Sequence, residues 1–232
     1  MKTAILCILS LVLASAGATS AQTTIIKLNT IKDADSVASI QYAYPHFRDG
    51  RVVFINQGIT PAKLNYSRVN GEILFKNGNN ILALNQLETI KLVTIEKDTF
   101  FVSPAGGFVK QIGRYPAVAL VKTSRLKLAG REVKAAYGGY SKVSVSRPLV
   151  TVSGSEQIGE RLAVDENLLY ALTTTYYLLT SANKLIEASE KAFLLGYADN
   201  KKEIKTFIDS AKINFNKEND LTRLLHFAQS FH

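Results

Sequence analysis

The sequence predicts an α+β protein, in which an antiparallel, strand-rich, roll-like or barrel-like body precedes a C-terminal group of short amphipathic helices. Short apolar runs with a period near two recur from residue 51 onward and are separated by turn residues. No alternation of strands and helices is visible, which argues against a doubly wound parallel sheet. Near residue 186 the period changes to that of a helix. The 232 residues, 47% of them hydrophobic, are sufficient to bury a core.

The first half of the body shows the clearest strand pattern. We expect a turn at 58–61 and a hairpin turn at Asn70-Gly71, because both of these residues tolerate a positive φ. The Asn-rich segment 76–80 repeats that turn chemistry. The strands predicted around these turns are 51–55, 63–66, 72–75 and 81–84.

The second half of the body is less regular. Further strands are predicted at 90–95, 99–102, 108–112, 117–128 and 143–145. We interpret the polar, glycine-bearing segment 151–167 as a connecting loop and 168–179 as one more strand or a strand pair. Residues 22–40 are interpreted as a mixed lead-in without a dominant period.

Three short amphipathic helices are expected to close the chain. The first is predicted at 189–197, and Asn200 is expected to cap the second, with Glu203 completing a capping-box-like arrangement. Their apolar faces are most simply core, packed on the sheet or on each other, and the alternative is a partner-binding groove. The apolar positions with helical spacing are Ile204, Phe207, Ile208 and Ala211, then Leu221, Leu224, Leu225 and Ala228.

The N-terminus has the pattern of a secretory signal peptide. Lys2 precedes an apolar run over 4–13, and small residues then offer cleavage after Ala18 or Ala21. The run is too short to span a membrane, and Cys7 lies within it, which is the wrong place for a lipidated cysteine. We therefore expect 1–21 to be removed and the protein to be exported, so that it is periplasmic, outer-membrane-associated or secreted.

Removal of this segment defines the expected chain. It takes away the single Cys and the single Met, so no disulfide and no thiolate metal site would remain. No later run is long and apolar enough for a transmembrane helix. The expected organisation is a β-rich body at 22–185 and a helical segment at 186–232, packed on the body or beside it.

No motif in the sequence nominates an enzyme. His46, His226 and His232 lack partners at metal-ligand spacing, and no phosphate-binding loop is present, so we expect no metal and no cofactor. The 181–184 segment fits S-x-x-K only formally. A hydrolase with an unidentified carboxylate pair stays open, because sequence cannot show two carboxylates facing each other across a cleft. The local carboxylate pairs are Asp33/Asp35, Asp165/Glu166 and Glu187/Glu190.

The positive charge is concentrated in one stretch. Between 110 and 147 there are nine basic residues and one acidic residue, Glu132, whereas the flanking segments are close to neutral. Tyrosines are interleaved with the cations, and a period of two would place several cations on one outward sheet face. The candidate binding residues are Lys110, Arg114, Lys122, Arg125, Lys127, Arg131, Lys134, Tyr137, Tyr140, Lys142 and Arg147.

A basic strand face suits an anionic envelope polymer or lipid headgroups. An exported protein meets little nucleic acid, so nucleic acid is not expected as a partner. The simpler alternative is that the cations serve solubility and protect strand edges from aggregation. The leading hypothesis is an envelope-associated binding or structural protein that acts through this face. The other alternative is an adaptor that docks a protein partner through its helical tail.

Several motifs along the chain resemble those of a protein group. They include Tyr44-Pro45-His46-Phe47, Leu64-Asn65-Tyr66 and 71–75 in the body, and Lys212-Ile213-Asn214-Phe215 in the tail. This series resembles a group of uncharacterised exported proteins common in Bacteroidetes. The resemblance implies a cell-envelope protein and transfers no catalytic residue.

Overall fold

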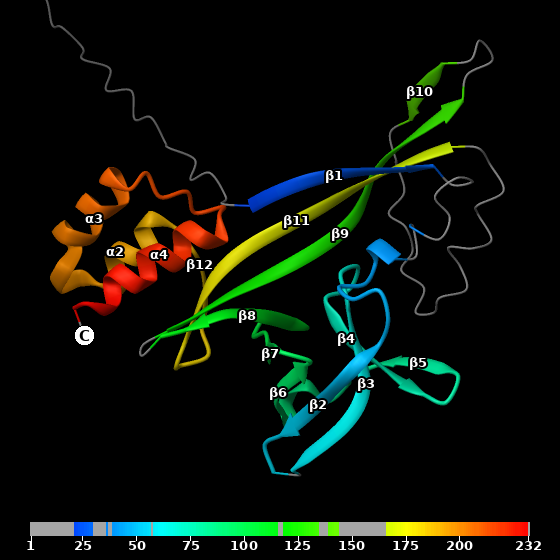
Figure 1. Cartoon of the computed structure of the whole chain (residues 1–232), viewed down its shortest axis with the longest axis horizontal. Coiled ribbons are helices and arrows are strands. Elements are labelled where there is room, and N and C mark those ends of the chain that lie inside the picture. The colour runs from blue at the N-terminus through cyan, green and yellow to red at the C-terminus, as the bar shows by residue number, and fades with distance from the viewer. Residues whose placement is uncertain are drawn as a thin grey trace, which may run out of the picture.

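The computed structural model shows an α+β fold, as predicted, with a large antiparallel sheet and a few C-terminal helices (Figure 1). It describes residues 21–29, 36, 39–56, 58–115, 118–134, 139–143 and 166–231. The strands form one 12-stranded sheet in the order β1-β11-β9-β8-β7-β6-β2-β3-β4-β5, to which β10 adds beside β9 and β12 beside β11. The expected signal peptide and most of the expected loop at 151–167 lie outside the described residues.

The first half of the sheet is a meander of short strands. Its members are β2 (Arg48–Phe54), β3 (Ile59–Ser67), β4 (Glu72–Asn77), β5 (Asn80–Ala83), β6 (Ile90–Ile95), β7 (Asp98–Val102) and β8 (Phe108–Arg114). Each includes most of a strand predicted from the sequence. The largest difference is at β3, which begins inside the expected turn and contains Pro61. At Pro61, β3 pairs with β2 alone, because its pairing with β4 starts at Leu64. The missing proline N–H therefore removes no hydrogen bond to a second neighbouring strand.

Two long strands connect this meander to the rest of the molecule. They are β9 (Val118–Lys134) and β11 (Glu166–Thr180), which pair along their length with a register shift at Leu169/Tyr170. The sequence left open whether 168–179 was one strand or two, and it is one. β10 (Tyr140–Val143) lies mostly before the expected strand at 143–145, and β12 (Leu185–Glu187) follows β11 through a tight turn.

The expectation for the lead-in at 22–40 was wrong in its first part. Ala21–Asn29 forms β1, which pairs antiparallel with β11 through all nine of its residues. Threonine and isoleucine dominate the middle of this segment, and β-branched side chains favour extended backbone. The second half of β1 packs on the long strands, where Ile26 and Leu28 contact the cluster of Leu126, Leu168 and Tyr170.

Two clusters of buried side chains hold the strands together. The larger lies inside the meander and is built around Leu64, Ile73 and Phe100. The smaller lies on the long strands and contains Leu126, Leu168 and Tyr170. Along most of these strands alternate residues supply the contacts, which is the period of two that the sequence displayed. β6 departs from it between Ile90 and Val93, beside the register shift at Val53/Phe54.

The helices are α2 (Glu190–Gly196), α3 (Lys201–Ser210) and α4 (Glu218–Gln229), with the short 3-10 turns η1 (Leu87–Thr89) and η3 (Ala198–Asn200). Ser189 caps α2 by accepting a hydrogen bond from the Ala192 N–H. The capping box expected at Asn200 does not form, because the Asn200 side chain makes no cap hydrogen bond. α4 begins at Glu218, three residues before the first of the apolar positions predicted for this helix, Leu221.

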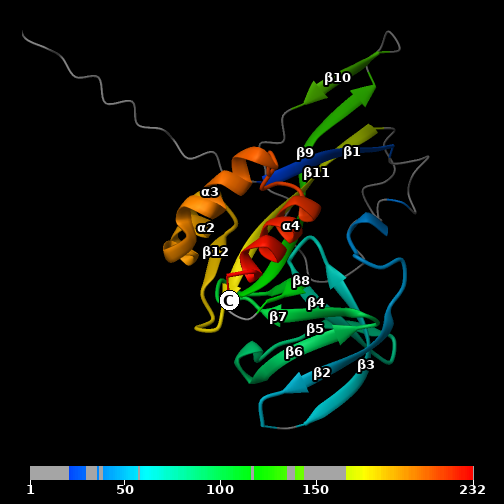
Figure 2. The ribbon, with the colours of Figure 1, turned by 60° about the vertical axis from the view of Figure 1, so that its left-hand side comes forward.

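The apolar helix faces form the third core cluster, as predicted. Ile204, Leu221, Leu224, Leu225 and Ala228 are fully buried, together with strand residues. The other members include Tyr115, which follows β8, Leu120 of β9, and Tyr176 and Leu178 of β11. Figure 2 shows the helices gathered at one end of the long strands, with the meander lying below the strands. In the described part of the chain, no helix is long and apolar enough to cross a membrane.

Candidate functional site

Strands β1, β11 and β9 lie side by side and bring distant parts of the sequence onto one face. The register places Ile25 opposite Ala171, which lies opposite Lys127. Residues directly opposite on neighbouring strands share a face, and alternate residues of each strand return to it. We call this surface the Lys127 face, and it comprises Thr23, Ile25 and Lys27 of β1, Leu169, Ala171 and Thr173 of β11, and Arg125 and Lys127 of β9.

The β1 side of this face is open to solvent. The Ile25 side chain is 58% exposed and that of Lys27 is 52% exposed. Lys127 is also exposed, on the β9 side. The Thr23 and Thr173 hydroxyls lie 3.2 Å apart across the β1–β11 pair. The face therefore combines ammonium groups, hydroxyl groups and one exposed aliphatic side chain.

Arg125 belongs to this face by register, but its head group is used inside the protein. Arg125 Nη1 donates a hydrogen bond to the Tyr66 hydroxyl at 2.7 Å. Burial raises the pKa of the Tyr66 phenol, and the nearby guanidinium opposes that rise. The guanidinium lies directly against Gly71, in the turn between β3 and β4. Arg125 thus links β9 to the meander.

Lys110 and Lys122 lie opposite each other on β8 and β9, and each has an acidic partner from elsewhere in the chain. Lys110 Nζ is 2.6 Å from Asp98 Oδ2, and Lys122 Nζ is 2.7 Å from Glu218 Oε2 at the start of α4. These ion pairs separate two like charges that would otherwise repel across the strand pair. The charge of both lysines is offset within the fold.

The distal end of the long strands holds a polar network. Lys27 Nζ is 2.5 Å from Glu132, whose carboxylate also accepts from Asn167 at 3.4 Å. Asn29 donates to Asn167 at 3.2 Å, and both amides are buried. The exposed Tyr140 ring lies under Lys27 Nζ, 5.6 Å from its centroid. The network orients Lys27 at the margin of the Lys127 face.

The remaining candidate residues fall into four groups. Arg131 is 3.8 Å from the largely buried Glu166 carboxylate, so it is also engaged internally. Arg114 and Lys134 are exposed near opposite ends of the long sheet. Lys142 pairs with Glu132 through the backbone of β10, and nothing is described of its side chain. Tyr137 and Arg147 lie outside the described residues.

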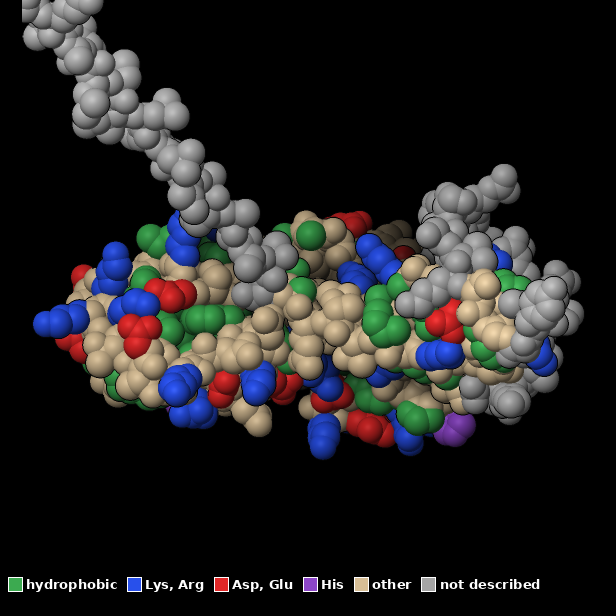
Figure 3. All heavy atoms as spheres, turned by 90° about the horizontal axis from the view of Figure 1, so that it is seen from above, with side chains coloured by type: hydrophobic (Ala, Val, Ile, Leu, Met, Phe, Trp, Pro, Cys, Tyr) green, Lys and Arg blue, Asp and Glu red, His purple; other side chains and the backbone are tan. Residues whose placement is uncertain are grey.

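The structure therefore distributes the basic segment over several environments. Figure 3 shows Lys and Arg side chains interspersed with Asp and Glu over the surface seen there. Of the predicted site residues, Lys127 stays exposed on a face that also carries Lys27 and Ile25. The sequence analysis missed the two β1 residues, because it did not recognise the β-branched run at 23–26 as a strand.

A second polar cluster lies in the meander. The Tyr44 hydroxyl donates to Asp98 Oδ2 at 2.5 Å, beside the Lys110 ammonium. Burial and the carboxylate raise the pKa of Tyr44. Burial also favours the neutral form of Asp98, but the hydrogen bonds from Lys110 and Tyr44 outweigh it and lower the pKa of Asp98. Each polar group of this cluster has a hydrogen-bond partner within it, which indicates a structural role.

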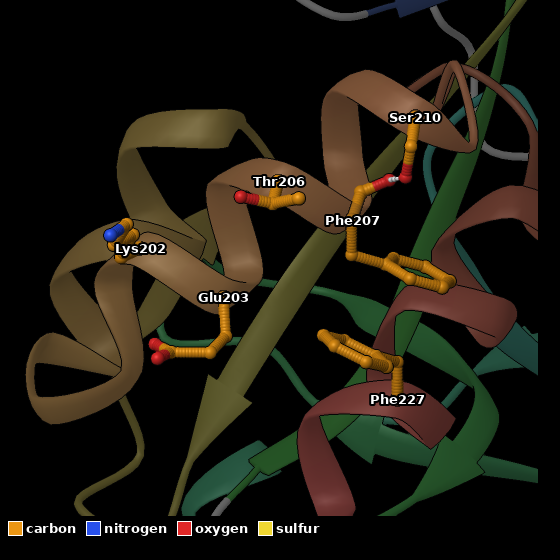
Figure 4. Close-up of a pocket in the computed structure, with 6 residues that line it drawn as sticks. All are labelled: Lys202, Glu203, Thr206, Phe207, Ser210 and Phe227. Carbon is orange, nitrogen blue, oxygen red and sulfur yellow. Dashed lines mark hydrogen bonds between the residues drawn. The ribbon is translucent and has the colours of Figure 1, made fainter.

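A shallow groove lies between α3 and α4. Its floor is a pair of stacked rings, Phe207 and Phe227, whose centroids are 4.1 Å apart with nearly parallel planes. Lys202, Glu203 and Thr206 line its α3 side, as Figure 4 shows. The groove contains no facing carboxylates and no nucleophile–base pair, so its geometry indicates packing between helices.

The described residues offer little catalytic geometry. They contain no group of three or more His, Cys, Asp or Glu side chains that could hold a metal ion. Ser181 and Lys184 are exposed in the β11–β12 turn, where the Lys184 N–H donates to Thr180. Glu132 lies opposite Asn167, the chain neighbour of Glu166, so the two carboxylates point to opposite faces of the sheet.

No protein-family model, curated protein or solved structure matches this chain.

Proposed function

We propose that this protein is an exported, envelope-associated binding protein that holds a negatively charged polymer on its Lys127 face. The observation that carries the proposal is the exposure of Lys127 on a strand face that also carries Ala171 and the hydroxyls of Thr23 and Thr173. Lys27 lies at the margin of this face and keeps its ion pair with Glu132. An exposed ammonium group with hydroxyl groups on the same face can bind the carboxylate or phosphate groups of such a polymer.

The shape of the face favours a polymer over a small ligand. Small ligands bury most of their surface in a concave pocket. The Lys127 face instead is a strand surface that runs along β1 from Thr23 to Lys27, which at about 3.3 Å per residue is roughly 13 Å. An extended ligand can contact successive residues of such strands, whereas a compact one would contact only a few.

Export, and a relation to the exported Bacteroidetes proteins, are part of this proposal. Export is supported by the signal-peptide pattern at 1–21, and the first described strand, β1, starts at Ala21. Cleavage after Ala18 leaves the whole strand, and cleavage after Ala21 removes only the residue opposite Thr175. Both cuts are therefore compatible with the β1–β11 pairing. N-terminal sequencing of the protein recovered outside the cytoplasm would identify the cut, and an uncleaved cytoplasmic chain would contradict export.

The binding test uses beads of polygalacturonate, a carboxylate polymer, with dextran beads as the neutral polymer. We expect retention on polygalacturonate at low salt and release as salt rises, because exposed charges are screened. Lys127→Glu should weaken retention by about fivefold to tenfold, since one cation near an anionic surface contributes about 1 kcal/mol. Lys91→Glu, at an exposed position on β6, makes the same charge change away from the face and should leave retention unchanged.

Two outcomes would contradict the proposal. Equal losses for Lys127→Glu and Lys91→Glu would mean that net charge alone causes retention. Binding to phosphatidylglycerol vesicles without binding to polygalacturonate would replace the polymer with a lipid surface.

A further inference from the structure

β1 is an open edge of the sheet. In the strand order it is terminal, with β11 on one side and no described strand on the other (Figure 1). It is nine residues long, whereas β5 at the opposite end has four, and β10 and β12 have four and three. A long edge strand presents a row of backbone N–H and C=O groups that can pair with another strand.

The first half of β1 is also uncovered on both faces. Gln22, Thr23, Thr24 and Ile25 are consecutive exposed residues, so side chains on either side of the strand reach solvent. This half is held by its ladder with β11 and by the Thr23–Thr173 hydroxyl contact. Proteins commonly protect such an edge with several charges, a proline or a bulge. β1 has a single charge, Lys27, and no proline.

We propose that β1 pairs antiparallel with β1 of a second copy of this chain, about a two-fold axis at Ile25. This register places Ile25 against Ile25 of the second copy and Lys27 against Thr23, so no two lysines lie opposite each other. All nine residues of β1 then have a partner across the interface. A symmetric dimer of this kind uses the same patch on both copies, so the segment must be complementary to itself.

The neighbouring registers are less favourable. In each neighbouring register, the two-fold axis passes through a different residue of β1. An axis at Lys27 would set two ammonium groups directly opposite each other, which is destabilising. An axis at Thr24 or Ile26 would no longer bring the two exposed Ile25 side chains together. The register about Ile25 therefore combines apolar contact with charge separation.

The dimer would extend the binding surface. A two-fold axis perpendicular to the sheet keeps equivalent faces on the same side, so the Lys127 faces of both copies would join across the two β1 strands. A polymer could then contact both copies at once, which raises its apparent affinity by effective concentration. This consequence rests on the proposed function, whereas the dimer itself does not.

The test is the mass of the purified protein measured by sedimentation equilibrium over a range of concentrations, without any polymer. We expect twice the chain mass at high concentration. Ile25→Lys, which brings two ammonium groups together at the axis, should reduce the mass to that of one chain. Leu82→Lys, the matched change at an exposed residue of edge strand β5, should leave the dimer intact.

A crosslink tests the register. In a chain carrying Cys7→Ser, the variant Ile25→Cys should form a disulfide-linked dimer on mild oxidation, and Leu82→Cys should not. A single-chain mass at every concentration, or a dimer unaffected by Ile25→Lys, would overturn the proposal. Because no polymer is present, these outcomes are separate from the retention experiment. If the protein is a monomer that polygalacturonate still retains, the dimer proposal fails and the proposed function stands.

Discussion

The guanidinium of Arg125 occupies the space that a side chain on residue 71 would need. A Cβ added to Gly71 would lie 1.6 Å from Arg125 Nη1, and Gly71 has a φ of +71°. The Gly71 carbonyl accepts a hydrogen bond from the Phe108 N–H at 2.9 Å, and Arg125 itself donates to Tyr66. The β3–β4 turn is thereby joined to β8 and β9. Glycine is required here both by backbone conformation and by the close approach of the arginine.

Replacing Gly71 by alanine should therefore destabilise the protein strongly. A positive φ costs alanine about 1 kcal/mol, and displacing Arg125 from Tyr66 adds the loss of a partly buried hydrogen bond, for a total of about 3 kcal/mol. Gly78→Ala is the matched control, because Gly78 also has a positive φ but nothing within 4 Å of an added Cβ. Gly78→Ala should lower the free energy of unfolding, measured in urea, by about 1 kcal/mol. Equal losses for the two variants would contradict the role of Arg125.

A double-mutant cycle separates the clash from the backbone strain. In the Arg125→Ala background, Gly71→Ala no longer meets the guanidinium, so its cost should fall towards that of Gly78→Ala. The losses of unfolding free energy in the two single variants should then add up to about 1 to 2 kcal/mol more than the loss in the double mutant. Strict additivity in urea unfolding would show that the two residues act independently.

The lowered pKa of Asp98 predicts that the protein loses stability in acid. This pKa is lowered in the folded protein by Lys110 and Tyr44, despite burial. A group with a lowered folded pKa stabilises the fold above its unfolded pKa, about 3.9, and this contribution is lost as pH falls through the folded pKa. The urea midpoint of the wild type should drop more between pH 7 and pH 3 than that of Asp98→Asn. The control is Asp49→Asn, which removes an 88% exposed carboxylate from a surface ion pair with Lys63 and should alter the drop less than Asp98→Asn does.

Much of the fold could be predicted from the sequence, because its strands and helices carry local signals. Alternating apolar residues marked the meander, and the spacing of Leu221, Leu224 and Leu225 marked the buried face of α4. β1 was missed because its first half is exposed on both faces, so its side chains do not alternate between apolar and polar. Its β-branched residues were the available signal. The capping box at Asn200 matched in composition only, since the side chain makes no cap contact.

The candidate site was less predictable, because charge neutralisation depends on tertiary contacts. The segment from 110 to 147 contains one acidic residue, yet Asp98, Glu166 and Glu218 approach its cations from β7, β11 and α4. Nothing in the local sequence indicates these partners. The cross-strand neighbours of Lys127 are equally remote in sequence, since they come from β1 and β11.

The helical segment should unfold together with the sheet. Leu224 is fully buried in the cluster that also contains Leu120 and Tyr176 of the long strands. Leu224→Ala should cost about 3 kcal/mol and lower the stability of the whole chain in a single transition. Leu195→Ala, at a 69% exposed position on α2, should change stability by less than about 0.5 kcal/mol. A helical transition separate from that of the strands would indicate an independent tail, as the adaptor alternative requires.

The ion pair between Lys122 and Glu218 predicts a salt-dependent contribution to stability. Glu218→Gln leaves the Lys122 ammonium facing Lys110 across the β8–β9 pair, and it removes a carboxylate from the first turn of α4, where the helix dipole favours a negative charge. We expect a loss of about 1 kcal/mol at low salt, because the pair is partly exposed, and a smaller loss in 1 M salt. Asp209→Asn, which removes an exposed partner of Lys205 within α3, should cost less at low salt. A loss for Glu218→Gln that does not change with salt would mean that packing of the side chain, not its charge, stabilises the contact between α4 and the sheet.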